Sequence, residues 1–324
     1  MNGWVILDKP LGLGSTQAVA AVKRVCRERG LGKVKVGHGG TLDPLATGVL
    51  PIALGEATKL TGQMLDASKI YDFTIAFGTE TDGLDAEGAV VATSEVRPTL
   101  AAIEAVLPRF TGPIEQVPPA YSAIKIDGQR AYDRARAGEA VAMVARSVII
   151  YSLTLRHPRE GGDPSDAAAL LHKQEMDSRL RGNDEREDGL SAITLTAHVS
   201  KGTYVRSLAR DIAHALGTVG HVSMLRRTKA GPFTLDQAIS LDKLNEFGQG
   251  AAHSDVLLPL EAGLVDIPAL NLSPEAAGAI RQGRALTGVA TDDGLYWAHG
   301  GDFRPLALVT LSAGTLKIAR GFNL

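Results

Sequence analysis

The sequence predicts an α+β protein whose sheet is mixed or antiparallel. Residues 70–77 alternate between apolar and polar side chains, with Tyr71, Phe73, Ile75 and Phe77 on one side. Residues 193–199 alternate in the same way, and a period of two is typical of strands with one buried face. Helical patterns are interspersed with these strands without a steady strand–helix–strand rhythm, which favours the α+β class.

The elements near the N-terminus follow from local signals. Residues 5–7 form a short buried strand, and the Pro- and Gly-containing stretch 10–14 is a turn. Ser15 or Thr16 then caps a helix whose apolar face is formed by Val19, Val22 and Cys26.

Further elements are predicted along the chain. Thr99 opens a helix that runs to about Arg109, and residues 120–126 form a strand. A later helix stops at Gly217, and its apolar face is formed by Val205, Leu208 and Ile212.

Two stretches define the domain organisation. Residues 157–189 are polar, show no sustained period, and separate two strands, 146–156 and 190–200, that would otherwise be hairpin neighbours. We therefore expect a disordered, dispensable insertion there. From about residue 256, short apolar runs are separated by glycines, which indicates a small β-rich domain. The predicted domains are 1–255 and 256–324.

Composition excludes several classes of protein. The chain has 324 residues, of which 44% are hydrophobic and 22% charged, as in ordinary globular proteins. No apolar run is long enough to cross a membrane, and the N-terminus lacks the pattern of a secretory signal, so a cytoplasmic location is expected. Cys26 is the only cysteine, which excludes an internal disulfide and a thiolate zinc cluster. The eight histidines show no ligand spacing, and we expect no metal and no cofactor.

The charge distribution is compatible with nucleic-acid binding. The net charge is only -2, but the basic residues cluster. One group is Lys23, Arg24, Arg27, Arg29, Lys33 and Lys35, and another is Arg226, Arg227 and Lys229. Such clusters suit a phosphate backbone, although solvated helix ends explain them equally well.

The sharpest signal for chemistry is the glycine-rich segment 37–48, which has Asp43 in its middle. Gly37, Gly39 and Gly40 permit positive φ, and Pro44 biases Asp43 away from helical geometry. The segment lacks the Lys-Ser/Thr ending of a phosphate-binding loop. Two interpretations remain open: a catalytic carboxylate on a stiff turn, or an aspartate that caps the next helix.

The sequence around Asp43 resembles the catalytic motif of the TruB family of tRNA pseudouridine synthases. The motif reads GHGGTLDPLATGVLP over residues 37–51, and the family usually has Thr where this chain has Gly39. Other segments that resemble the family are LDKP at 7–10, LGEATK at 54–59, PPAYSAIK at 118–125 and SKGTYVR at 200–206. The resemblance covers nearly the whole chain except residues 157–189, and it is weak over the last domain.

The resemblance implies a role for each matching residue. Asp43 would be the essential carboxylate, paired with Arg206, and Tyr71 would stack on a flipped uracil. His38, Tyr204 and Leu225 would contact the RNA or line the base pocket, and Lys9 would contact a phosphate. Taken alone, Tyr71 reads as a core residue because it shares a face with Phe73 and Phe77, and Arg206 reads as a surface arginine at the start of a helix.

The resemblance also implies the pseudouridine-synthase fold with a C-terminal PUA-like domain, and an isomerase that acts on uridine 55 in the T-arm of tRNA. We expect a monomer. The alternative is a non-catalytic tRNA-binding chaperone. A second rival, a carboxylate-dependent nucleotide hydrolase, would need another catalytic carboxylate or a metal.

Overall fold

The computed structural model describes residues 1–324 apart from 123, 127, 140, 157–188 and 250–255. Its chain divides into a first unit, residues 1–67 with 229–324, and a second unit, residues 68–228. The predicted insertion at 157–189 lies outside the described residues except for its last residue. The predicted domain boundary at residue 255 stays a prediction. None of the helices in the described part of the chain combines the length and apolar character that a bilayer span requires.

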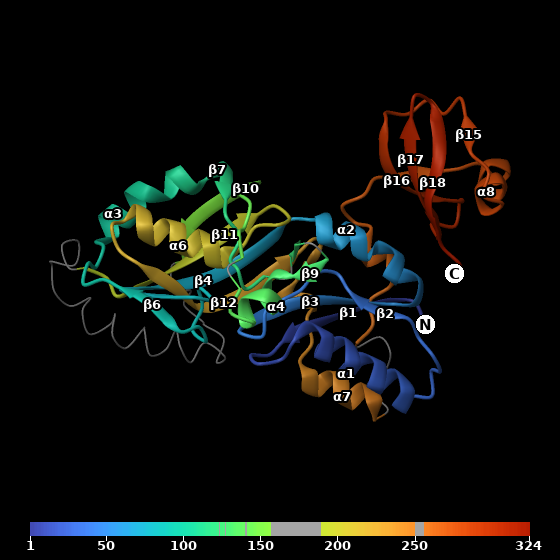
Figure 1. The fold of residues 1–324 in the computed structure, drawn as a ribbon. Coiled ribbons are helices and arrows are strands. Elements are labelled where there is room, and N and C mark those ends of the chain that lie inside the picture. Colours follow the sequence, from blue (N-terminus) through green and yellow to red (C-terminus); the bar gives the residue numbers. More distant parts are fainter. Residues whose placement is uncertain (123, 127, 140, 157–188, 250–255) are drawn as a thin grey trace. The chain divides into compact units, whose positions relative to one another are not determined.

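The first unit begins with three antiparallel strands. β1 (Gly3–Lys9) pairs with β3 (Ala46–Leu54) along its whole length, and β2 (Val36–His38) also pairs with β3. The 3-10 segment η1 (Gly55–Leu60) and α2 (Thr61–Asp66) follow β3. α1 (Ser15–Glu28) contacts α7 (Leu241–Gly248), and Figure 1 shows the two helices side by side.

α1 begins one residue earlier than its sequence suggested. Its N-cap is Gly14, and the Gln17 side chain returns to accept a hydrogen bond from the Gly14 N–H at 2.7 Å. Capping by Ser15 or Thr16 is therefore wrong, because the Ser15 hydroxyl is used elsewhere. The buried face is confirmed for Val22 and Cys26, whereas Val19 is only half-buried.

The C-terminal part of the first unit is a five-stranded sheet in the order β14-β16-β17-β18-β15. The pairs are antiparallel except for β14 with β16. The predicted β-rich end of the chain is thus confirmed. Its elements are β14 (Ala269–Asn271), α8 (Pro274–Arg281), β15 (Leu286–Thr287), β16 (Gly294–His299), β17 (Pro305–Ser312) and β18 (Thr315–Gly321). Between α7 and β14 lies η5 (Leu260–Gly263).

The second unit contains a sheet in the order β12-β4-β11-β10-β7. β4 (Lys69–Phe77) pairs antiparallel with β11 (Ala192–Val199), which pairs with β10 (Arg146–Leu155), which pairs with β7 (Gly112–Gln116). β12 (Gly220–Ala230) ends in the first unit, where it pairs with β13 (Phe233–Thr234) ahead of η3 (Leu235–Gln237). The predicted α+β class with antiparallel pairing is confirmed.

Helices cover one face of this sheet, as Figure 1 shows. α6 (Val205–Ala215) buries Leu208 and Ile212 against Phe73 and Leu195, which confirms the predicted faces of the helix and both strands. α3 (Leu100–Val106) is capped by Thr99, as predicted, and continues into η2 (Leu107–Phe110).

The strand predicted over residues 120–126 is wrong for most of its length. Only β8 (Lys125–Ile126) is a strand, in a hairpin with β9 (Gln129–Arg130) before α4 (Ala131–Arg136). Residues 117–122 form a loop instead, because polar groups of the loop bond to the start of α6. A second hairpin joins β5 (Thr79–Thr81) to β6 (Val90–Thr93).

Candidate active site

Asp43 lies half-buried in a tight turn between β2 and β3. The Asp43 carbonyl accepts a hydrogen bond from the Ala46 N–H at 3.0 Å, which closes the turn. A strand follows this turn rather than a helix, so the interpretation of Asp43 as a helix cap is wrong. The catalytic interpretation is the one left of the two.

Both neighbours of Asp43 are anchored through their main chains. The Ser15 hydroxyl donates to the Leu42 carbonyl at 2.9 Å and accepts from the Leu42 N–H at 2.8 Å. On the other side, the Pro44 carbonyl accepts from the Gly12 N–H at 2.9 Å and from Lys9 Nζ at 3.3 Å. These contacts fix the backbone on either side of the carboxylate, which is what preorganised catalysis requires.

Lys9 does not serve as the predicted phosphate contact. Its side chain is 0% exposed, and its ammonium group donates to the carbonyls of Pro10 at 3.0 Å, Leu13 at 2.7 Å and Pro44. An ammonium group has three N–H donors, and three carbonyls already use them. Lys9 therefore ties the turn after β1 to the turn that carries Asp43.

The glycines of the motif have different physical reasons. Of the three glycines before Asp43, only Gly40 adopts a positive φ, at 136°. Gly39 is required by space, because a Cβ there would lie 2.6 Å from the Cβ of Met64 in α2. Met64 therefore occupies the space that the family's usual threonine would need. His38 ends β2, and its Nδ1 lies 3.4 Å from the Gly40 N–H; its contact with RNA stays a prediction.

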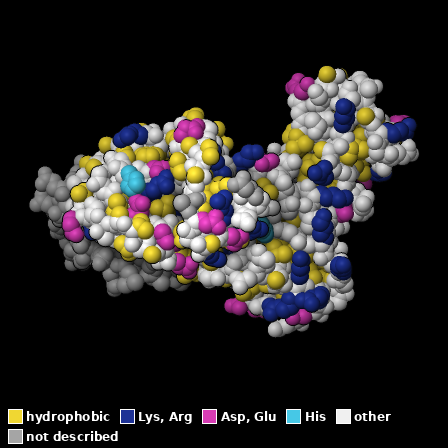
Figure 2. Space-filling model, in the orientation of Figure 1, with side chains coloured by type: hydrophobic (Ala, Val, Ile, Leu, Met, Phe, Trp, Pro, Cys, Tyr) yellow, Lys and Arg dark blue, Asp and Glu magenta, His cyan; other side chains and the backbone are white. Residues whose placement is uncertain are grey.

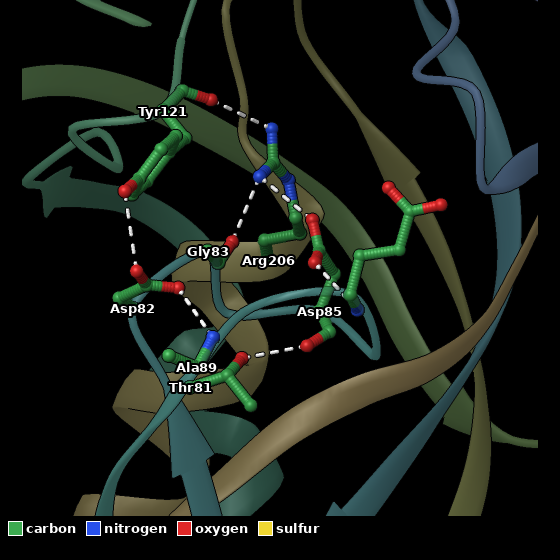
Figure 3. Close-up of polar contacts among 8 residues, drawn as sticks. Thr81, Asp82, Gly83, Asp85, Ala89, Tyr121 and Arg206 are labelled. Atoms are coloured by element: carbon green, nitrogen blue, oxygen red, sulfur yellow. Dashed lines mark hydrogen bonds and ion pairs between the residues drawn. The ribbon is translucent and has the colours of Figure 1, made fainter. Parts of the chain in front are cut away.

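Arg206 is buried at the start of α6, with 6% exposure. Its interpretation as a surface arginine is therefore wrong. Figure 3 shows the guanidinium held by two loops of the second unit. Nη1 donates to the Gly83 carbonyl at 2.7 Å and to Asp85 Oδ2 at 3.0 Å, and Nη2 donates to the Tyr121 carbonyl at 3.0 Å.

The two loops that hold Arg206 are joined to each other. The Tyr121 hydroxyl donates to Asp82 Oδ2 at 3.1 Å, and this hydrogen bond raises the pKa of Tyr121. Between Gly83 and Asp85, Leu84 is buried with a φ of 59°, a conformation that bulky residues rarely adopt. Its carbonyl accepts from the Val222 N–H at 3.0 Å. The loop is therefore held in an unfavourable shape by its surroundings.

Tyr204 is the N-cap residue of α6 and lies half-buried beside Arg206 in the chain. The side-chain amide of Gln116, which is buried, accepts from the Tyr204 N–H at 2.7 Å and donates to the Tyr204 carbonyl at 3.1 Å. The Arg146 guanidinium lies 4.7 Å above the Tyr204 ring. Ser207 adds a bond to the Val117 carbonyl at 2.8 Å, so the start of α6 is fastened to the loop after β7.

Tyr71 and Leu225 belong to strands β4 and β12, which are adjacent in the sheet. Both side chains are half-buried at the edge of the apolar cluster that contains Phe73. Tyr71 thus has one side in the core and one side free of it, which combines the two interpretations of this residue. The structure groups Lys9, His38 and Asp43 in the first unit, and Tyr71, Tyr204, Arg206 and Leu225 in the second.

The basic clusters differ in exposure. Lys23, Arg24 and Arg27 are exposed on α1, and Figure 2 shows Lys and Arg side chains gathered over this part of the first unit. Arg227, by contrast, is only 1% exposed. It is therefore not available to a phosphate backbone, which corrects its assignment to the second basic cluster.

The sequence assigned no role to five residues that position the site: Ser15, Asp82, Asp85, Gln116 and Tyr121. The one available signal was the pair of carboxylates flanking Gly83, within a predicted turn. In the described part of the chain, no group of three or more His, Cys, Asp or Glu side chains is arranged to hold a metal ion.

Comparison with known proteins identifies the family. Residues 27–168 match the TruB family pseudouridylate synthase N-terminal domain, and residues 206–265 match the tRNA pseudouridylate synthase B C-terminal domain. The chain is 64% identical over 324 residues to a tRNA pseudouridine synthase B of Novosphingobium aromaticivorans, covering 100% of this chain and 98% of the relative. A protein of the same name from Zymomonas mobilis is 52% identical, with 100% and 96% covered.

Solved structures agree at the level of fold. A Cbf5-Nop10-Gar1 complex contains a chain with a TM-score of 0.69 and 25% identity, covering 99% of this chain and 84% of that one. An H/ACA RNP bound to a substrate RNA also gives a TM-score of 0.69, at 22% identity, with 99% and 85% covered. The predicted fold, isomerase class and family are thus confirmed, and the chain belongs to the TruB family of pseudouridine synthases.

Proposed function

We propose that this protein converts uridine 55 in the T-loop of tRNA to pseudouridine, with Asp43 as the essential carboxylate. The observation that carries the proposal is the turn around Asp43. Leu42 and Pro44 are both held by main-chain contacts to residues 9–15, so the carboxylate is presented on a fixed backbone. A binding protein has no need of a fixed carboxylate facing a polyanion.

The chemistry needs one carboxylate and no redox step. The uracil leaves C1′ of its ribose, turns, and rejoins through carbon. An ionised Asp43 could act as the nucleophile, stabilise a cationic sugar or remove a proton. We propose that Arg206 pairs with Asp43 and keeps it ionised, and its buried guanidinium, oriented by Asp85, Gly83 and Tyr121, suits this role.

The target base lies inside a folded loop, so it has to be flipped out and held. We propose that Tyr71 stacks on it, since the ring is half-buried beside a rigid apolar cluster. Tyr204 and Leu225 complete the base pocket, and His38 contacts the RNA nearby. The T-arm of tRNA is the substrate, residues 256–324 form a PUA-like RNA-binding domain, and the protein acts as a cytoplasmic monomer.

The test is replacement of Asp43 by Asn, which keeps shape but removes charge and nucleophilicity. Pseudouridine formation at position 55 of an unmodified tRNA transcript should fall below detection, while the Kd for that transcript stays within roughly tenfold of the parent. Asp242→Asn, an exposed carboxylate in the first turn of α7, is the matched control and should leave turnover unchanged. Turnover near the parental rate in Asp43→Asn would remove Asp43 from the mechanism. A parent protein that binds tRNA and forms no pseudouridine would favour the chaperone alternative.

A further inference from the structure

A column of three aromatic rings lies at one end of the C-terminal sheet. The Trp297 and His299 rings of β16 have centroids 4.9 Å apart and an interplanar angle of 37°. The His299 ring in turn stacks on Phe303, with centroids 4.6 Å apart and an angle of 19°. Phe303 belongs to the turn that joins β16 to β17, so the column ends in a loop residue.

The inner rings give Phe303 a firm base. His299 is only 3% exposed, and its Nδ1 lies 2.6 Å from the Gly300 carbonyl, which fixes the ring. The His299 carbonyl accepts from the Leu272 N–H at 2.9 Å. A ring stacked on such a support loses little conformational freedom when a ligand covers its other face.

The backbone of Phe303 is in a conformation that its residue type disfavours. Its φ is 56°, in the left-handed region, which is uncommon for an aromatic residue. The Phe303 N–H donates to the Gly300 carbonyl at 3.2 Å, and Asp302 Oδ1 accepts from the Arg304 N–H at 3.2 Å. Glycine or asparagine would suit this position better, so folding alone does not explain a phenylalanine here.

The outer face of Phe303 is open, since the residue is 69% exposed. Its chain neighbours are Asp302 and the exposed Arg304, so a single ring is bordered by charged groups rather than by a wide apolar patch. A second exposed cation, Arg320, lies at the end of β18, whose Gly321 pairs with Ala307 near the start of β17. A flat ring with two cations at the same end of a sheet suits a base joined to phosphates, whereas a protein partner would need more apolar area.

We propose that Phe303 is a stacking platform for an unpaired nucleobase of the RNA substrate, with Arg304 and Arg320 taking the adjoining phosphates. This inference rests on the proposed action on tRNA and assigns the C-terminal sheet a specific contact. The site binds and does not react, so its loss weakens the complex without changing the chemical step.

The test measures equilibrium binding of a labelled, unmodified tRNA transcript to the full chain. Phe303→Asn keeps a residue that tolerates the left-handed backbone and removes the ring, so folding should be preserved while the Kd rises at least about fivefold. Phe303→Trp keeps a stacking surface and should bind within about twofold of the parent. Val265→Asn is the matched control: this apolar side chain of the same unit is 74% exposed, and its loss should leave the Kd unchanged.

Turnover separates this proposal from the proposed function. At saturating tRNA, Phe303→Asn should form pseudouridine at the parental rate, because Asp43 is untouched. Binding of tRNA by Phe303→Asn within twofold of the parent would overturn the proposal even if the isomerase activity is intact. An equal loss in the Asn and Trp variants would overturn it too, since the ring would then not be the group that matters.

Discussion

Tyr121→Phe removes one oxygen atom and tests how Arg206 is positioned. The Tyr121 hydroxyl is the printed tie between the loop that carries Asp82, Gly83 and Asp85 and the loop whose carbonyl accepts from Arg206 (Figure 3). Without that tie, the Tyr121 carbonyl is free to move away from the guanidinium. We therefore expect Arg206 to lose orientation although it is not itself changed.

The size of the effect follows from the type of bond. A hydrogen bond to a charged acceptor contributes about 1.5–3 kcal/mol, and the half-exposed position of Tyr121 favours the lower end because water screens it. A loss of about 1.4 kcal/mol in transition-state stabilisation corresponds to a tenfold lower kcat. KM should change little if Tyr121 acts only through Arg206. The free energy of unfolding should fall by about 1 kcal/mol.

The assay is single-turnover pseudouridine formation at saturating tRNA, with KM measured separately. Asp82→Asn should retain most activity, because the amide can still bond both the Tyr121 hydroxyl and the Ala89 N–H that Asp82 accepts from. Tyr296→Phe is a matched control, since this hydroxyl bonds to the Asp292 carbonyl in the C-terminal sheet. A higher KM with an unchanged kcat in Tyr121→Phe would refute the positioning role and assign Tyr121 to RNA binding. An unchanged kcat with lower stability would reduce the bond to a structural one.

The pH dependence gives an independent check. Hydrogen bonding to Asp82 raises the pKa of Tyr121 in the folded protein. The contribution of this bond to stability is therefore complete below the unfolded-state pKa of about 10 and is lost as the pH rises through the higher folded value. The difference in kcat between the parent and Tyr121→Phe should stay constant from neutral pH to about pH 9. A step in that difference near neutral pH would mean that another group carries the effect.

Three further outcomes are expected. Gly39→Thr should lower the free energy of unfolding by about 1–3 kcal/mol because its Cβ would collide with that of Met64, and an unchanged denaturation midpoint would contradict this. Replacement of residues 157–189 by a short Gly-containing turn should leave stability and turnover within about a factor of three, because Arg156 N–H bonds to the Thr194 carbonyl and the ends of the connection already meet; lost activity with an intact fold would make the segment functional. Neutralising the exposed cations of α1 should flatten the plot of log K for tRNA against log salt by roughly 0.7–0.9 per phosphate contact, and a parallel plot would place these cations, Lys23, Arg24 and Arg27, off the RNA path.

The sequence predicted those features that repeat along the chain or that a short motif encodes. The alternation at 70–77 and 193–199 was sufficient for β4 and β11, and the apolar spacing in α6 predicted its buried face. The segment 120–126 was assigned wrongly because its apolar composition resembles a strand, whereas tertiary bonds from Arg206 and Ser207 hold the neighbouring residues as a loop. Bonds between residues far apart in sequence leave no local period, so pattern reading cannot find them.

Lys9 and Gly39 show the same limit from another side. Both fall in segments that resemble the family, and both were interpreted through the RNA or through backbone freedom. The structure explains each by packing: Lys9 is enclosed by three carbonyls, and Gly39 faces the Cβ of Met64. A motif therefore marks residues that the site needs, but the motif alone does not separate those that touch substrate from those that hold the turn.

The two halves of the candidate site share one physical solution. Asp43 is presented by a backbone held at Leu42 and Pro44, through Ser15, Gly12 and Lys9. Arg206 is aimed by the main-chain carbonyls of Gly83 and Tyr121 in addition to the carboxylate of Asp85. Main-chain acceptors belong to turns whose shape is set by many contacts at once, so they hold a charged side chain more rigidly than flexible side chains would. This explains why much of the family-like sequence around both residues has no chemical role: it builds the turns on which one carboxylate and one guanidinium are held.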